Sequence, residues 1–110
     1  MTAILNIGLN AGDEPAWDLS DVKLALAACL PFEINVLSAV VHKSDTEQTA
    51  VVEISNPVTP QEAFAVAYAL SQDCIAQLAD GVGELYGPKA EEWGPFNPAY
   101  FILGNGERAA

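Results

Sequence analysis

The sequence predicts an α+β fold, a ferredoxin-like β-α-β-β-α-β sandwich with an extra C-terminal hairpin strand and a wrapping aromatic tail. Two kinds of apolar pattern support this fold: short alternating runs typical of strands, and two longer segments with helical spacing. The order of these segments along the chain is that of a ferredoxin-like sandwich. With 110 residues, the chain has the size of one domain, so we expect residues 1–110 to fold together.

The first strand and the first helix are predicted from alternation and from capping residues. Residues 3–9 alternate between apolar and less apolar positions, which is typical of a strand. Residues 10–15 are rich in turn formers and predict a loop. Asp18 can cap a helix that runs to Leu30, because Pro31 cannot continue it.

Two further strands, over 32–42 and 48–55, are predicted on either side of a polar loop at 43–47. One face of the first of these strands is unusually apolar. We expect the C-terminal tail or a second copy of the chain to cover it. The residues assigned to this outer face are Leu37, Ala39 and Val41.

The second helix has a strong start signal. Thr59 is expected to cap it, Pro60 to occupy its first position, and Glu62 to complete a capping box. We expect the helix to span 60–72. Its predicted buried stripe comprises Ala63, Phe64, Ala67 and Leu70, with Tyr68 as a further candidate.

The segment after this helix allows two interpretations. Helical spacing could continue to Leu78, but Asp80-Gly81 is a strong hairpin turn between two apolar runs. We favour a hairpin over 74–86. A short helical turn at 89–93 and a proline-interrupted aromatic segment at 94–102 follow. The aromatics of this tail suit either a flap that closes a sheet face or a peptide-binding platform.

The charge of the chain limits its partners. Fifteen acidic residues against four Lys and Arg give a formal net charge of −11. Nucleic acids and anionic membranes are bound by basic residues, so we expect neither as a direct partner. A basic surface on another protein suits this charge. Acids are present at about the usual frequency, and bases are scarce.

No catalytic or metal-binding pattern is evident. His42 is the single histidine, and its neighbours Ser44 and Asp45 are too close in sequence to form a triad with it. The spacing of His, Cys and carboxylates fits no zinc or calcium site, and we expect no cofactor and no enzymatic activity. Cys29 and Cys74 are expected to be reduced thiols, and no signal peptide or apolar span is evident, which predicts a cytoplasmic protein.

The predicted topology gathers acidic loops at one end of the sheet. The loop after the first strand, the loop at 43–47 and the turn near Asp73 are expected to lie together there, with the segment after Tyr86 close by. The alternative is a set of ordinary solvated loops. The residues that we predict to bind a basic partner are Asp13, Glu14, Asp18, Asp45, Glu47, Glu91 and Glu92.

Three segments resemble small phage- and prophage-encoded accessory proteins. They are His42–Glu47, Ser71–Gln77 and Gly87–Phe101. The resemblance implies a host-cell setting and a class of proteins that often inhibit host defence, anti-CRISPR proteins among them. It assigns no functional residue.

Three hypotheses follow. The first is a non-enzymatic phage protein that inhibits a CRISPR-type complex by binding its basic, nucleic-acid-binding surface. The second is a phage structural or assembly protein that self-associates, as a homodimer for example, through its outer sheet face. The third is a small enzyme or ligand-binding domain, which requires a deep pocket lined by His42 and carboxylates.

Overall fold

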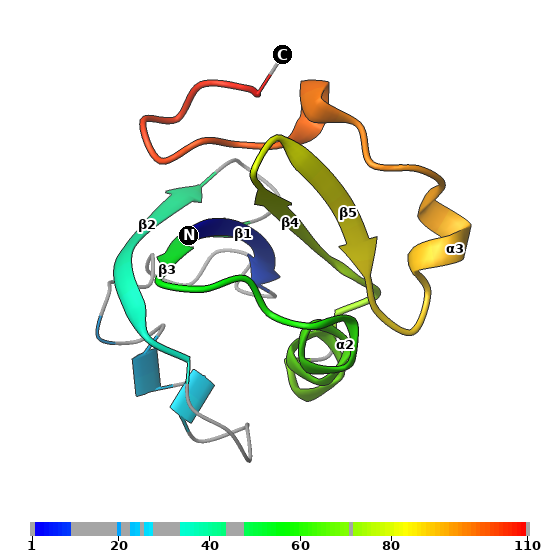
Figure 1. The fold of residues 1–110 in the computed structure, drawn as a ribbon, viewed down its shortest axis with the longest axis horizontal. Coiled ribbons are helices and arrows are strands. Elements are labelled where there is room, and N and C mark those ends of the chain that lie inside the picture. Colours follow the sequence, from blue (N-terminus) through cyan, green and yellow to red (C-terminus); the bar gives the residue numbers. More distant parts are fainter. Residues whose placement is uncertain are drawn as a thin grey trace.

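The fold is described by a computed structural model (Figure 1). The structure describes residues 2–9, 20, 23–24, 26–27, 34–43, 48–70 and 72–109. Its strands are β1 (Ala3–Leu9), β2 (Val36–Lys43), β3 (Gln48–Ile54), β4 (Ile75–Ala79) and β5 (Val82–Tyr86). Its helices are α2 (Pro60–Ala69), the single-turn α3 (Ala90–Trp93) and a 3₁₀ turn (Pro98–Tyr100).

The strands form one antiparallel five-stranded sheet in the order β2-β3-β1-β4-β5. The predicted α+β class is therefore confirmed, and the segment after α2 is a hairpin and not a continued helix. Asp80 and Gly81 form its turn, and both have positive φ angles, 51° and 76°. Asp and Gly tolerate this conformation better than other residues do, which explains why the Asp-Gly pair predicts the turn.

The ends of the elements are close to those predicted. The first strand has the predicted bounds, whereas β2 begins at Val36, four residues after the predicted start. Of the helix predicted from Asp18 to Leu30, the described residues 20, 23–24 and 26–27 are helical, and the rest lies outside the described residues.

The predicted outer face of β2 is wrong, because a β-bulge at Leu37 changes its alternation. Val36 pairs with Ile54 and Ser38 with Glu53, so Leu37 is an extra residue in β2. Beyond a bulge the side chains change faces. Ala39 and Val41 consequently pack against the core. Leu37 and Val40 are the apolar residues of β2 that are exposed.

One face of the sheet carries the main core. Every second residue of β1 and β3 is buried there, together with Leu26 and the inner side of α2. The capping box predicted at α2 is present: Thr59 Oγ1 accepts from the Glu62 amide, and Glu62 Oε1 accepts from the Thr59 amide.

The buried side of α2 differs in part from the prediction. Ala63, Val66 and Ala67 are buried, whereas Phe64 and Tyr68 are 46% and 73% exposed. The buried residues have the i, i+3, i+4 spacing of one helix face, and Phe64 and Tyr68 lie beside it.

A buried glutamine joins the start of α2 to the sheet. Gln77 of β4 is 6% exposed, and its Oε1 accepts from the Val58 amide at 2.8 Å. Its Nε2 donates to the Val58 carbonyl at 3.2 Å. Both polar atoms of this buried side chain are therefore satisfied, and α2 is fixed over β4.

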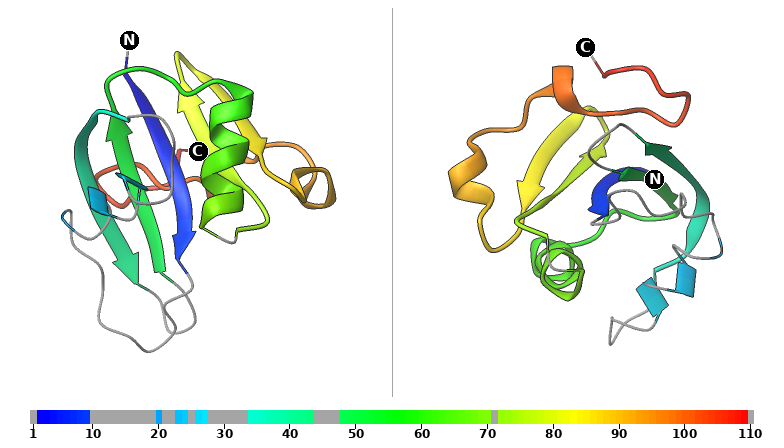
Figure 2. Two further views of the ribbon diagram at one scale, coloured as in Figure 1. Left: turned by 90° about the horizontal axis from the view of Figure 1, so that it is seen from below. Right: turned by 180° about the vertical axis from the view of Figure 1, so that it is seen from behind.

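The segment after α3 crosses the opposite face of the sheet, so the sheet lies between α2 and this segment (Figures 1 and 2). We call residues 94–109 the C-terminal segment. Of the aromatics from Trp93 onwards, Phe101 is 2% exposed, whereas Trp93 and Tyr100 are 64% and 77% exposed. One tail aromatic is thus a core residue, and two face solvent.

Candidate functional site: a pocket beneath the C-terminal segment

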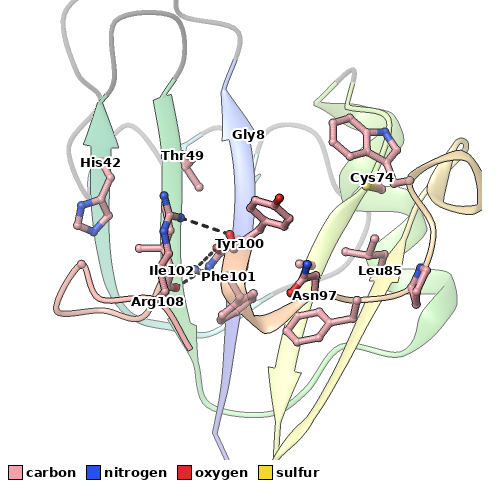
Figure 3. A pocket seen from close by; sticks show the side chains of 16 residues that line it. Gly8, His42, Thr49, Cys74, Leu85, Asn97, Tyr100, Phe101, Ile102 and Arg108 are labelled. Carbon is pink, nitrogen blue, oxygen red and sulfur yellow. Dashed lines mark hydrogen bonds between the residues drawn. The ribbon is translucent and has the colours of Figure 1, made fainter. Parts of the chain in front are cut away.

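A pocket of about 1000 Å³ lies between the sheet and the C-terminal segment (Figure 3). All five strands or their immediate ends contribute to its sheet side, through Asn6, Gly8, His42, Thr49, Cys74, Ala76 and Leu85. Its other wall comprises Trp93, Pro95, Phe96, Asn97, Tyr100, Phe101, Ile102, Gly106 and Arg108. This volume is in the range of pockets that bind small molecules.

A paired hydrogen bond attaches the C-terminal segment to the central strand. Asn6 Nδ2 donates to the Ile102 carbonyl at 2.9 Å, and the Ile102 amide donates to Asn6 Oδ1 at 2.7 Å. The side-chain amide of Asn6 thus occupies both main-chain groups of Ile102, as a neighbouring strand would. This contact fixes the height of the segment over β1.

Aromatic packing holds the segment over the β4–β5 side. Phe96 and Phe101 are in contact at a centroid distance of 5.4 Å with a tilt of 51°. Phe96 also lies directly on the backbone of β5, because a Cβ at Gly83 would come within 2.3 Å of its ring. Only glycine leaves room for the ring at this position.

The end of the segment folds back as a small turn over β2. The Leu103 amide donates to the Glu107 carbonyl at 2.8 Å, and Ile102 and Arg108 form an antiparallel bridge. Gly106, whose φ of 87° requires a residue tolerant of the left-handed region, lies against the ring of His42. The turn therefore brings Arg108 to the side of the pocket that contains His42.

Arg108 gives the described lining of the pocket a positive charge, opposite in sign to the net charge of the chain. Among the lining residues that the structure describes, Arg108 and His42 are basic and none is acidic. The Arg108 guanidinium donates to the Tyr100 carbonyl at 3.4 Å. His42 Nε2 is buried and has no hydrogen-bond partner among the described residues. The third hypothesis required a deep pocket lined by His42 and carboxylates. The pocket found here includes His42 but is open on one side and has no carboxylate among its described lining residues.

Cys74 lies at the other side of the pocket. It directly precedes β4 and is a free thiol. Burial, and then the negative charge of Asp73, raise the pKa of Cys74 above its ordinary value. Three strand spacings separate β2 from β4, which places Cys74 about 14 Å from His42 along the sheet. The thiol therefore has no histidine close enough to act as its base, and its raised pKa keeps it in the unreactive, protonated form.

The predicted acidic end is described only in part. Strands β1 and β2 end, and β3 and β4 begin, at the same end of the sheet, where β5 also ends. Glu91 and Glu92 follow β5 on α3 and are exposed. Asp73 lies just before β4 and accepts a hydrogen bond from Trp93 Nε1 at 3.4 Å. The other predicted binding residues, Asp13, Glu14, Asp18, Asp45 and Glu47, lie outside the described residues.

Comparison with known proteins gives no identity. Family models, curated proteins and solved structures all lack a match to this chain. The resemblance to phage and prophage accessory proteins therefore stays a prediction. Within the described ranges, no cluster of three or more potential metal ligands occurs. No helix among the described residues is long and apolar enough to cross a membrane.

The sequence indicated His42 as a residue of a possible pocket, but not that the pocket lies beneath the C-terminal segment. The one available signal for this location was Asn6, a polar residue in the middle of an otherwise apolar strand. A polar side chain on a covered sheet face needs a hydrogen-bond partner, and Asn6 finds it at Ile102. Sequence spacing gave no indication of that partner, 96 positions away.

Proposed function

We propose that this protein is a non-enzymatic binding domain that holds a small molecule between its sheet and its C-terminal segment. The observation that carries the proposal is the pocket of about 1000 Å³ beneath this segment. It combines apolar walls with a few polar groups, as ligand sites commonly do. Its walls are fixed in place by the Asn6–Ile102 pair and by the Phe96–Phe101 contact.

The chemistry of the lining residues favours binding over catalysis. A nucleophile needs a base within hydrogen-bond reach and a pKa suited to attack. Cys74 has a raised pKa and lies three strand spacings from His42 along the same face of the sheet. The lining residues within the described part of the chain include no carboxylate that would act as a general acid or base.

Binding of N-phenyl-1-naphthylamine, a neutral aromatic probe whose emission rises in apolar sites, tests this proposal. We expect about one probe to bind per chain. Ala76→Trp, on β4 inside the pocket, should abolish binding by filling the space. Val82→Trp introduces the same side chain at an exposed position of β5 that does not line the pocket, and should leave binding unchanged. Circular dichroism checks that both variants fold. Absence of binding to the wild type, or equal binding by the two variants, would refute the proposal.

A second candidate function uses the acidic end of the sheet. We propose that Asp13, Glu14, Asp18, Asp45, Glu47, Glu91 and Glu92 bind a basic surface of a host protein, such as the nucleic-acid-binding surface of a CRISPR-type complex. Its support is the common end of the sheet at which the strand termini meet, together with the exposed Glu91 and Glu92. This function places the protein in the host cytoplasm.

Charge reversal tests the second candidate. A pull-down from host lysate at low and high salt identifies a partner, and its association rate is then measured. The double variant Glu91→Lys/Glu92→Lys should slow association, as should Asp45→Lys/Glu47→Lys. The control Glu53→Lys/Asp80→Lys has the same change in charge but lies towards the opposite end of the sheet. Equal rates in all three variants would exclude an acidic binding site.

Two further proposals concern the fold family and self-association. The strand order β2-β3-β1-β4 with β5 added at the edge suits a ferredoxin-like sandwich with an extra hairpin strand. Self-association through β2, as in a phage assembly protein, would now use the exposed Leu37 and Val40. A sedimentation mass that shows a salt-insensitive dimer would favour it.

A further inference from the structure

We infer that the ligand of this pocket carries an anionic group, which binds at the β2–β3 side between Arg108 and His42. The inference rests on the proposed binding function and adds the chemical class of the ligand. It predicts an amphipathic organic anion, with a carboxylate, phosphate or sulfonate at one end and an apolar, preferably aromatic, body at the other.

The distribution of charge is the first observation. The whole chain has only four Lys and Arg against fifteen Asp and Glu. One of these four bases, Arg108, lines the pocket together with the single histidine, and none of the described lining residues is acidic. A guanidinium presents several N–H donors in a plane and suits an oxyanion group.

The unpartnered nitrogen of His42 is the second observation. Its Nε2 is buried without a hydrogen-bond partner among the described residues, although buried polar atoms are normally paired. A histidine ring can present an N–H at this atom. Because the atom is buried, an oxyanion reaches it only when the Gly106 turn, which lies against the ring, moves aside. Arg108 and Thr49 lie on the same side of the pocket as His42 in Figure 3, and Thr49 is the cross-strand neighbour of His42.

The opposite side of the pocket determines the rest of the ligand. Leu85, Ala76 and Phe96 form an apolar wall there. Asp73 lies close to this side through its contact with Trp93, and would repel an anionic group. The anion is therefore expected near Arg108 and the apolar body near Leu85.

The negative charge of the chain does not prevent this binding. Exposed charges are screened beyond about 8 Å at physiological ionic strength. The contacts with Arg108 and His42 are local, and none of the described residues that line the pocket is acidic. The remaining repulsion lowers the overall affinity equally in all variants of the same net charge.

A pair of probes with the same aromatic core tests the inference. 8-Anilinonaphthalene-1-sulfonate carries a sulfonate, and N-phenyl-1-naphthylamine lacks it. We expect the sulfonate probe to bind the wild type more tightly. Arg108→Gln should weaken its binding about tenfold, as is typical for loss of one charge-assisted hydrogen bond, and should leave the neutral probe unchanged. Lys89→Gln removes the same charge outside the pocket and should change neither. His42→Phe keeps a planar aromatic ring at this position. It should weaken binding of the sulfonate probe but not of the neutral probe.

The outcomes separate this inference from the proposed function. If neither probe binds, or if Ala76→Trp leaves binding of both intact, the pocket is not a ligand site. If both probes bind the pocket equally and Arg108→Gln weakens them equally or not at all, the pocket binds ligands but has no anion site. If Lys89→Gln weakens binding of the sulfonate probe as much as Arg108→Gln does, the loss is a general effect of charge. That result would also overturn the inference.

Discussion

Asn6 of the central strand forms two hydrogen bonds with the main chain of Ile102, and so connects residues 96 positions apart. On the opposite face of the sheet, Gln77 forms the same two bonds with Val58. Each side-chain amide pairs with the main-chain N–H and C=O of one residue, as a neighbouring strand would. The C-terminal segment and the start of α2 are thus attached to the sheet by the same type of paired side-chain to main-chain hydrogen bond.

Asn6→Ala should release the C-terminal segment. The change leaves the amide and carbonyl of Ile102 unpaired, which should cost about 1–2 kcal/mol in the free energy of unfolding. It should also increase hydrogen exchange across residues 102–109 and reduce probe binding in the pocket. Urea unfolding measures the stability. Asn56→Ala is the control, because Asn56 is exposed and its side chain bonds, among the described residues, to its neighbour Ser55. An equal, small effect of both variants would show that the Asn6–Ile102 pair has no structural role.

Gln77→Glu should destabilise the protein in a pH-dependent way. The introduced carboxylate is buried and its charged form is disfavoured, so its pKa in the folded state lies above the value of about 4.3 in the unfolded chain. The folded state then binds more protons, and stability falls as pH rises above about 4.3. We expect a loss of at least about 2 kcal/mol at pH 7, compared with the wild type. Gln61→Glu, exposed on α2, should show no such dependence. Urea unfolding at pH 4 and pH 7 distinguishes the two.

Gly83→Ala should displace Phe96. A Cβ at this position would lie within 2.3 Å of the ring, so the ring must move or the strand must shift. We expect a loss of about 1–3 kcal/mol, as for other overpacked sites. Gly104→Ala places its Cβ where no atom lies within 4 Å and should be nearly neutral. Thermal unfolding of the two variants checks this difference, and equal melting temperatures would contradict it.

Tyr86 should ionise at an unusually high pH. Burial, followed by its hydrogen bond to Glu84 at 2.7 Å and the charge of that carboxylate, raises the pKa of Tyr86 to about 12. Because the folded pKa lies above the unfolded value of about 10, this tyrosine reduces the free energy of unfolding as pH rises from about 10 through 12. Absorbance at 295 nm should show a late titration step. Tyr86→Phe should remove this step, and Glu84→Gln should move it to lower pH. A late step that persists in Tyr86→Phe would belong to another residue.

Cys74 should react slowly with alkylating reagents. Its pKa is raised, chiefly by burial, and the thiolate is the reactive form. In a Cys29→Ala background, the rate of carboxamidomethylation at pH 7 should be well below that of the same chain in urea. The difference should narrow above pH 9. Rapid reaction of the folded protein at pH 7 would show that Cys74 is activated and would weaken the argument against catalysis.

Local signals were enough to predict most elements of this fold. The capping box at Thr59 and the Asp80-Gly81 turn each depend on residues that are neighbours in sequence, and both are present. The strand bounds of β1 followed from simple alternation. Where neighbouring residues alone determine the backbone conformation, the element could be predicted from the sequence.

The faces of β2 and the pocket could not be predicted in this way. Residues 36–41 are apolar on both faces apart from Ser38, so either register of the strand would bury apolar side chains. The bulge at Leu37 determines which register occurs. No Gly or Pro in this segment indicates the bulge in the sequence. The pocket depends on contacts such as Gly106 with His42, and Asn6 with Ile102. These contacts exist only after distant parts of the chain have met.

The distance between Asn6 and Ile102 along the chain also sets the order in which the two walls of the pocket are made. During synthesis at about 5–20 residues per second, β1 emerges several seconds before Ile102. Until then the face of β1 that carries Asn6 lacks its final cover. A newly made chain therefore passes through a stage at which the sheet face is open to chaperones, to other nascent chains or to ligand, and the C-terminal segment ends that stage when it docks.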